Sequence, residues 1–409
     1  MIALYILETE QHHWLFSLIQ YFMIAVAVLV VLARQWVAAG RLILWSSFLV
    51  ATAAMITVLN QTELTSEFRS FSVNCLMIVA WSQLLWNRQQ IELAMTALGF
   101  AGLLSAGLLI SAYDFEALSS ATAATAWELR TGAGLPGGNV NIASMYIALS
   151  FSICIGYAIS GRRTISRRLW WLGVAMLQAG AIVLTGSRKA LIACAIAVLF
   201  HALLVSIRKT ITWLGVTAAV TLLASRSEAF FLAIGHRFSG DGGTSVSDGY
   251  RLDAASEALA AFSAHPLGLG WGRSYTVLSE LYYTHSNYLE VLVSLGVAGL
   301  VLYYWLPVIS LRAALSQSRL ATPGQISQLA AVLLVTLLVI DITQVTYLYR
   351  GPLIALALAV MAVKVGAVAP SQPFPAGMNL AVRPGEGNSH ESMLHADVTE
   401  RRLTQPQLT

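Results

Sequence analysis

The chain has 409 residues, of which 57% are hydrophobic and only 11% are charged. Soluble domains carry about 25% charged residues, so the composition excludes a soluble globular protein and predicts an all-α polytopic integral membrane protein. The formal net charge of +4 comes from basic residues spread between apolar runs, which excludes a nucleic-acid-binding protein. The three cysteines, Cys75, Cys154 and Cys194, fall within apolar runs, so we expect neither a disulfide framework nor a cysteine metal site.

The predicted elements are membrane-spanning helices, each of which needs about 20 apolar residues. Eleven segments approach this length, at roughly 14–33, 42–59, 70–86, 92–112, 142–160, 169–185, 190–207, 211–224, 286–311, 326–346 and 351–369. The loops on one side carry eleven basic residues, whereas the short loops on the other side carry five. The positive-inside rule makes the first side cytoplasmic, which predicts an outside N-terminus and an inside, disordered tail at 370–409.

Two long loops, 113–141 and 225–284, are both expected outside the membrane, and long loops are commonly functional. Four apolar residues recur at helical spacing in the second loop: Leu252, Ala255, Leu259 and Phe262. They predict an amphipathic helix over 250–262 that lies on the membrane surface. A turn-rich connector, "HPLGLGWG" (265–272), follows this helix.

A polar cluster opens the apolar run at 286–311. His285 titrates near neutral pH and can accept and return a proton, and Asn287 and Glu290 follow it closely. An ionisable group where a span begins is a functional hypothesis, and the alternative is a histidine that anchors a helix end at the headgroups. Gly296 and Gly299, deeper in the run, predict close approach of a neighbouring helix.

Four arginines are predicted on the outer side: Arg130, Arg188, Arg251 and Arg273. Arg130 lies in a Gly-rich loop that ends with Asn139 and Asn141 at the mouth of a span. Arginines that converge with a histidine suit an anionic lipid substrate, such as a phosphate or diphosphate, whereas each arginine alone could simply reach the headgroups. The sequence contains no P-loop, which argues against ATP-driven transport, and no metal-ligand spacing.

The stretch "THSNYLEVLVSLGVAGL" (284–300) resembles the signature of the O-antigen ligase and O-antigen polymerase superfamily. That signature is a His, a small polar residue, nine residues and then Gly-x-x-Gly. Three more segments resemble family motifs in the same order: "RTGAGLPGGNVNIAS" (130–144), "GSRKALIA" (186–193) and "DGYRLDAASEALAAFSAHPLGLGWG" (248–272). The resemblance covers about residues 130–305. Family members usually have about twelve spans with the N-terminus inside, and a tighter turn than "PLGLGWG".

The resemblance implies an inverting, metal-independent glycosyltransferase, with no cofactor, on the outer face of the bacterial inner membrane. The donor would be a glycan on undecaprenyl diphosphate, and the acceptor a sugar hydroxyl on the lipid A core or on a lipid-linked repeat unit. His285 would take the acceptor proton, and Arg188 and Arg251 would stabilise the leaving diphosphate. The remaining candidates would bind substrate: Arg130, Asn139, Asn141, Arg273, Asn287 and Glu290. The lipid bilayer is the second expected partner, and a chain-length regulator stays open.

The sequence leaves three activities open, and two of them, ligase and polymerase, share the same site. The third is a transporter or flippase, which would predict inverted repeats and polar residues at mid-membrane. The sequence shows no repeat and few such residues: Glu290, Asp341 and Gln344. We therefore expect N-terminal transmembrane helices (1–129), a ligase-like catalytic region (130–311) that includes the outer loop, C-terminal transmembrane helices (312–369) and the tail (370–409).

Overall fold

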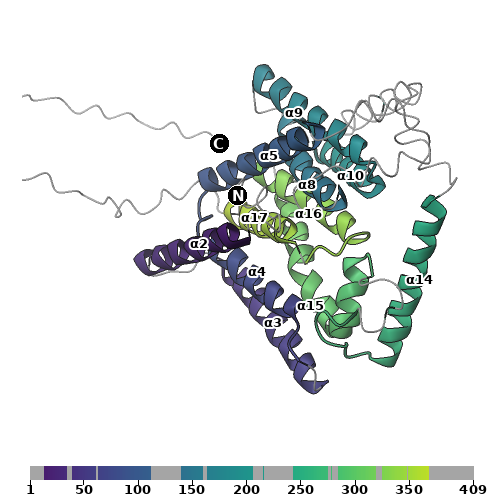
Figure 1. Ribbon diagram of the computed structural model, residues 1–409. Helices are drawn as coiled ribbons and strands as arrows, with labels where there is room; N and C mark the ends of the chain where they lie inside the picture. Colours follow the sequence, from purple (N-terminus) through teal and green to yellow (C-terminus); the bar gives the residue numbers. More distant parts are fainter. Residues whose placement is uncertain are drawn as a thin grey trace, which may run out of the picture. The chain divides into compact units, whose positions relative to one another are not determined.

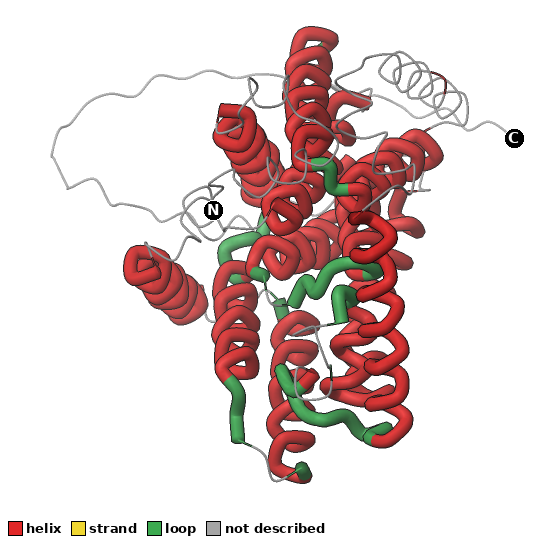
Figure 2. The backbone as a smooth tube through the Cα atoms, turned by 45° about the vertical axis from the view of Figure 1, so that its right-hand side comes forward, coloured by secondary structure: helices red, strands yellow, loops and turns green. Residues whose placement is uncertain are grey.

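The structure of the protein is a computed structural model (Figure 1). It describes residues 13–34, 39–60, 63–111, 140–159, 164–205, 215, 243–274, 278, 284–318, 325–347 and 349–367. All of these residues belong to one compact unit, Met1–Val368. Their regular structure is helical, and no strand occurs among them (Figure 2).

Eleven helices run through the described residues. They are α2 (His13–Arg34), α3 (Gly40–Leu59), α4 (Ser66–Ser82), α5 (Arg88–Ser111), α8 (Val140–Ile159), α9 (Ile165–Thr185), α10 (Arg188–Val205), α14 (Gly243–Ala264), α15 (Asn287–Ser318), α16 (Gln325–Asp341) and α17 (Arg350–Gly366). Ten of them coincide with predicted spans, and α14 contains the helix predicted in the second long loop. The predicted span at 211–224 lies outside the described residues apart from Gly215, as do most of 113–141 and the whole tail.

Within the described part of the chain, six helices are long and apolar enough to cross a membrane. They are Gly40–Leu59, Arg88–Ser111, Asn141–Ile159, Ile165–Thr185, Arg188–Val205 and Asn287–Ser318. Tyr21–Ala33 and Ile326–Asp341 are shorter apolar helices. A helix satisfies its own backbone hydrogen bonds, as the bilayer core requires. The protein is an all-α polytopic membrane protein.

The centre of the unit is formed by α8 and α17. Every residue from Gly351 to Val363 of α17 is buried, and α5, α9, α10 and α16 all pack against α8. Helix α3, in contrast, turns Leu44, Phe48 and Met55 outward with more than half of each side chain exposed. Such apolar outer faces are stable where the surrounding solvent is lipid.

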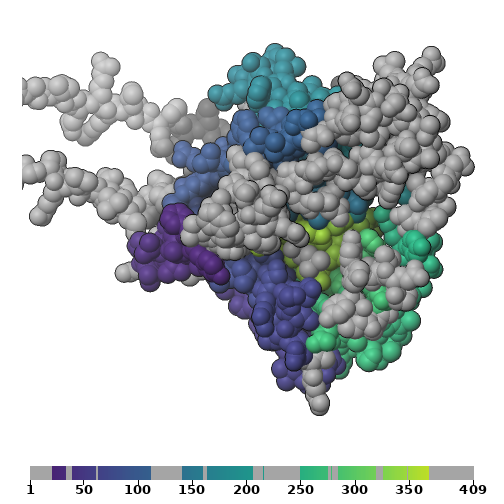
Figure 3. Space-filling model, viewed as in Figure 1, coloured from purple at the N-terminus to yellow at the C-terminus, as the bar shows by residue number. Residues whose placement is uncertain are grey.

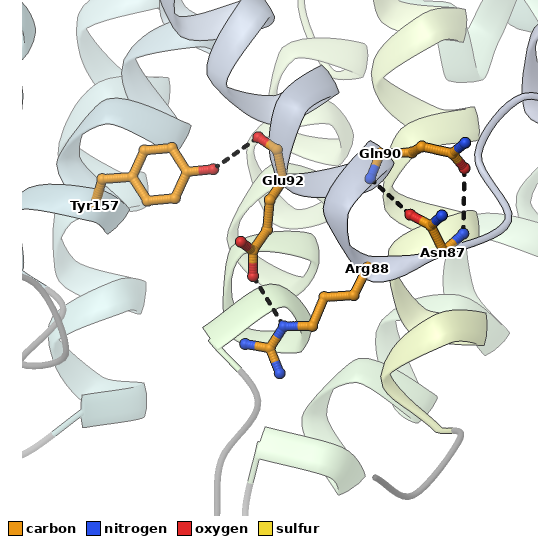
Figure 4. A network of polar contacts seen from close by, with 5 residues as sticks. All are labelled: Asn87, Arg88, Gln90, Glu92 and Tyr157. Atoms are coloured by element: carbon orange, nitrogen blue, oxygen red, sulfur yellow. Dashed lines mark hydrogen bonds and ion pairs between the residues drawn. The ribbon is translucent and has the colours of Figure 1, made fainter. Parts of the chain in front are cut away.

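Helix α5 begins with a reciprocal cap that its sequence "NRQQ" encodes (Figure 4). The Asn87 side chain accepts from the backbone N–H of Gln90 at 2.9 Å, and the Gln90 side chain accepts from the N–H of Asn87 at 3.4 Å. This capping box satisfies N–H groups that a helix start leaves without partners. Arg88 and Glu92 form an exposed ion pair at 2.9 Å, and Tyr157 of α8 donates to the Glu92 carbonyl at 3.5 Å.

The connector (residues 265–272) is held by the turn between α3 and α4. Asn60 donates to the Gly268 carbonyl at 3.0 Å, and Thr65 donates to the Trp271 carbonyl at 2.8 Å. Thr65 also caps α4, because its side chain accepts from the N–H of Phe68 at 3.1 Å. In the space-filling view the indigo atoms of α3 and α4 adjoin green atoms of this later part of the chain (Figure 3).

Helix α14 presents a different face to the protein than its sequence predicts. Ala254 and Ala258 are buried, whereas Leu252 and Leu259, from the predicted apolar stripe, are 72% and 50% exposed. Ala258 packs in a small cluster with Val293 of α15, and short alanine side chains let two helices approach closely. The two leucines therefore point away from the protein, and the predicted position on the membrane surface stays a prediction.

Candidate functional site

Helix α15 is bent sharply at Gly296, so the predicted span at 286–311 is not one straight helix. Gly296 has φ 66° and ψ −170°, which is not helical. Asn287 donates to the Tyr304 hydroxyl at 2.9 Å, although 17 residues separate them. In a straight helix these residues would lie about 25 Å apart, beyond the reach of both side chains. The chain thus forms a short arm (287–295), which folds back on a long, apolar arm (297–318).

The connector fills the bend and compensates for the helical hydrogen bonds lost there. The N–H groups of Leu269 and Gly270 donate to the carbonyls of Val293 and Ser294, both at 2.9 Å. In an unbroken helix these carbonyls would accept from residues four positions later. Gly268 has φ 95°, and a Cβ there would lie 2.5 Å from the Ser294 carbonyl oxygen. The connector and the bend therefore meet backbone to backbone.

The two signature glycines serve this bend rather than contact with a neighbouring helix, which corrects the prediction from the sequence. A Cβ on Gly296 would overlap the carbonyl oxygen of Pro266 in the connector, and one on Gly299 would overlap the side chain of Leu295. Gly299 thus leaves room for the last residue of the short arm. The sequence pattern is a bend motif in this protein.

His285 stands immediately before the short arm in an unusual backbone conformation. Its φ is 57°, and it is the only residue other than glycine with positive φ in the described ranges. Side chains with a Cβ rarely adopt this left-handed region, and residues held there cluster at functional sites. The backbone on either side is fixed, because the Thr284 hydroxyl donates to the Ser286 carbonyl at 2.8 Å.

Glu290 is 1% exposed, and its carboxylate joins three segments of the site. It accepts a short hydrogen bond from the Ser274 hydroxyl and one from the Tyr347 hydroxyl at 3.4 Å. Its other oxygen accepts from the N–H of Thr284 at 3.2 Å and lies 3.2 Å from the Thr284 hydroxyl. Glu290 thus contacts the residue before His285 and not the imidazole, which fits orientation through a neighbour.

Asn287 is fully buried and fastens the short arm to the loop between α16 and α17. Its side-chain oxygen accepts from the N–H groups of Thr346 and Tyr347 at 3.0 and 3.2 Å. The Tyr304 hydroxyl accepts a hydrogen bond from the Asn287 side-chain amide and donates one to Asp341 at 3.0 Å. Buried polar groups that are all hydrogen-bonded in this way give a rigid, specific packing. Asn287 and Glu290 were predicted to bind substrate, but the structure places them inside the protein.

Two positive charges act on the imidazole of His285. Burial is the largest effect on its pKa, followed by the charges of Arg251 and Lys189, and together they lower the pKa from 6.5 to about 4. The imidazole is therefore uncharged at neutral pH, and a ring nitrogen can accept a proton.

The surrounding fold holds Lys189 in place and brings Arg251 near His285. The Lys189 ammonium donates to the Thr343 carbonyl at 3.1 Å and, at short range, to the side-chain oxygen of Gln344. Arg251 lies two turns before Ala258, the α14 residue that packs beside Val293 of the short arm. His285 lies eight residues before Val293, so both residues are at the same end of this helix pair. Sequence reasoning named Arg251 but missed Lys189, although Lys189 is one of only three lysines in the chain.

The other predicted residues take different positions. Arg188 is partly buried and begins α10 two residues after Gly186, whose φ of 56° ends α9. Arg273 donates to the Glu63 carbonyl at 3.0 Å and so ties the connector to the turn before α4. Asn141 is at the start of α8, where its carbonyl accepts from the Ser144 hydroxyl at 2.9 Å. Arg130 and Asn139 lie outside the described residues.

Sequence reasoning also missed the hydroxyls that build the site, Ser274, Thr284, Thr346 and the Tyr347 phenol. No spacing pattern marks them, because they meet only after the chain folds. Asp341 and Gln344 were noticed as rare polar residues in apolar segments, and both belong to the walls of this site. In the described part of the chain, no group of three or more His, Cys, Asp or Glu residues could hold a metal ion.

The comparison with known families agrees with this geometry. A family model described as O-antigen ligase matches residues 172–304. The match runs from α9 into the long arm of α15, and it includes Arg188, Lys189, Arg251 and His285. No curated protein matches the chain. Residues 172–304 thus match the O-antigen ligase family, which supports the predicted resemblance to the O-antigen ligase and polymerase superfamily, and the chain that carries them is a multi-pass membrane protein.

Proposed function

We propose that this protein is an inverting glycosyltransferase that moves a glycan from undecaprenyl diphosphate to a sugar hydroxyl during synthesis of a bacterial surface polysaccharide. The observation that carries the proposal is the pairing, inside an O-antigen ligase domain, of an uncharged, rigidly placed His285 with the cations Arg251 and Lys189. A base beside fixed positive charge suits a reaction in which a hydroxyl attacks and a diphosphate leaves.

In the proposed reaction the acceptor hydroxyl oxygen forms a bond to the anomeric carbon from the face opposite the diphosphate. The bond from the anomeric carbon to the diphosphate oxygen breaks, and that oxygen keeps the electron pair. The hydroxyl proton passes to a ring nitrogen of His285. Arg188, Arg251 and Lys189 stabilise the charge that develops on the diphosphate, as preorganised cations do in phosphoryl leaving-group chemistry.

In this scheme, the low pKa of His285 makes the basicity of the imidazole depend on whether the donor is bound. Without substrate, burial and the charges of Arg251 and Lys189 keep the imidazole uncharged. A bound diphosphate brings negative charge, which opposes the effect of the two cations and raises the pKa. His285 thus becomes a better proton acceptor when the donor is in place. The scheme uses the energy of the sugar–diphosphate bond and needs neither a metal nor a cofactor.

We place the site on the outer, periplasmic face of the inner membrane, because the distribution of basic loop residues predicts that orientation. The lipid-linked donor would then approach from the bilayer and the acceptor from the aqueous side. The polar residues that a transporter reading would use, Glu290 and Asp341, hold the short arm in place instead. We therefore favour glycosyl transfer over a flippase.

The experiment that tests the function uses a deletion strain complemented with wild type, His285→Ala or, as a matched control, His265→Ala in the exposed part of the connector. Surface polysaccharide and undecaprenyl-linked glycan are measured. Accumulation of long lipid-linked polymer in the deletion strain identifies a ligase, and accumulation of single repeats identifies a polymerase. We expect His265→Ala to restore the polysaccharide and His285→Ala to fail. Restoration by a correctly inserted His285→Ala protein would refute the proposed base.

Purified protein separates transfer from transport. In liposomes that contain the lipid-linked donor, a glycosyltransferase forms a new glycosidic bond when acceptor is added. A flippase would change the leaflet of the donor without forming that bond, and this result would refute the proposal.

A further inference from the structure

The conformation of His285 needs an explanation beyond its role as a base. With φ at 57°, the residue occupies a region that a histidine leaves unless its neighbours hold it there. Of the two residues that flank His285, Thr284 is the one that is hydrogen-bonded to the Glu290 side chain. Its backbone N–H donates to the Glu290 carboxylate at 3.2 Å, and Thr284 is 2% exposed.

Glu290 is well placed to transmit the position of the short arm to Thr284. It belongs to the first turn of α15, whose start is fixed by Asn287, so its own backbone is fixed. The same carboxylate accepts from Ser274 and Thr284, two residues ten positions apart, and from Tyr347 in the loop after α16. Three independently positioned segments therefore determine where Thr284, and with it His285, can lie.

We propose that Glu290 is a positioning residue, which holds His285 in its left-handed conformation by binding the N–H of Thr284. The inference rests on the proposed function, because it assigns Glu290 to the alignment of the catalytic base with the acceptor hydroxyl. Glu290 itself does not touch the imidazole in this arrangement; it acts through the backbone of the preceding residue.

The hydrogen-bond pattern predicts how two substitutions differ. Glu290→Leu keeps a similar volume but removes every acceptor, so the Thr284 N–H loses its partner. Glu290→Gln keeps one oxygen, which can face the Thr284 N–H, while the amide nitrogen donates to the hydroxyls of Ser274 and Tyr347. Those hydroxyls can rotate and accept, whereas the backbone N–H of Thr284 cannot. The glutamine variant should therefore preserve the positioning, and the leucine variant should not.

The experiment compares Glu290→Leu, Glu290→Gln and a matched control, Gln178→Leu, in purified, folded protein. Gln178 is equally buried, and its amide binds Ser150 and the Gly99 carbonyl in the packing of α5, α8 and α9. Steady-state kinetics separate kcat from the KM for the lipid-linked donor, and amide hydrogen exchange followed by mass spectrometry reports the peptide that contains Thr284. This second readout does not depend on activity.

We expect Glu290→Leu to lower kcat by about 100-fold with little change in KM, because a displacement of about 1 Å costs that much. Exchange at Thr284 should be faster in this variant only. Glu290→Gln and Gln178→Leu should stay within about threefold of the wild-type kcat.

Two results would overturn the inference on its own, provided that His285→Ala is inactive. One is a wild-type kcat for Glu290→Leu, and the other is an equal loss of kcat in Glu290→Leu and Gln178→Leu. A fully active His285→Ala enzyme would instead refute the proposed function, and the positioning role with it.

Discussion

Gly296 offers the sharpest test of how the sequence builds this site. We predict that Gly296→Ala destabilises the protein and abolishes transfer, because the position requires a backbone conformation that residues with a Cβ rarely adopt. That conformation costs about 1–3 kcal/mol for alanine. The new methyl group would also overlap the Pro266 carbonyl oxygen and push the connector away.

The size of the effect follows from the contacts at the bend. Displacing the connector breaks the two hydrogen bonds from Leu269 and Gly270 to the carbonyls of α15, each of which contributes about 1 kcal/mol. The total is about 3–5 kcal/mol, a large part of the stability of a typical domain. Alanine also favours a continued helix by about 1 kcal/mol, and a straight α15 would carry His285 away from Lys189 and Arg251.

The measurement is thermal unfolding in detergent, together with transfer activity, for Gly296→Ala and for a matched control, Gly180→Ala. Gly180 lies in α9, and a Cβ there meets nothing within 4 Å. The control should unfold at the wild-type temperature or slightly above it, because alanine favours the helix. If Gly296→Ala matched the control in both unfolding temperature and activity, the bend would not be required, and our account of the signature glycines would be wrong.

Three further predictions concern the residues around the bend. The kcat/KM of transfer should be independent of pH from neutrality down to about 5 and then fall with an apparent pKa of about 4. This quantity reports the free enzyme, in which the pKa of His285 is lowered to about 4, and only the uncharged imidazole accepts a proton. An inflection near 6.5 in the pH profile of kcat/KM would contradict this. Lys189→Gln should raise that apparent pKa and lower kcat/KM for the donor by about tenfold, since it removes one of the positive charges that act on His285. An unchanged pH profile of kcat/KM would exclude Lys189 from the site. Asn287→Ala should lower the free energy of unfolding by about 2–4 kcal/mol, because it leaves the buried N–H groups of Thr346 and Tyr347 without their acceptor. Denaturation in detergent measures this free energy, and a decrease of less than about 1 kcal/mol would contradict the prediction.

The bend also explains why an ionisable residue stands where an apolar run begins. From the sequence, His285 is at the lip of a membrane-spanning helix. In the structure, the helix bends back at Gly296, and His285 lies just before the short arm (287–295). Asn287 of this arm donates to Tyr304, which in turn donates to Asp341. The residues from 284 to 295 therefore do not continue the long arm of α15 as a straight helix. They form a folded-back segment that brings the histidine under the influence of the charges of Lys189 in α10 and Arg251 in α14.

The sequence by itself determined the helices and the identity of the main chemical groups. Apolar runs of about 20 residues form helices in a membrane whatever their neighbours are, because the backbone must satisfy its own hydrogen bonds there. The cap of α5 is equally local, since Asn87 and Gln90 lie three residues apart and bond to each other. His285 and Arg251 were also named from residue chemistry and the family resemblance, and their catalytic roles stay predictions.

Only the tertiary structure decided how these groups meet. Gly296 in an apolar run is equally compatible with a straight helix, and the bend becomes stable because the connector supplies donors for the carbonyls of Val293 and Ser294. Lys189 approaches His285 because the loop after α16 holds its ammonium group. The burial of Glu290 and Asn287 was hidden for the same reason, since their partners are up to 60 residues away in the chain. Interactions between distant segments leave no periodic signal in a sequence, because their pairing exists only after the chain has folded.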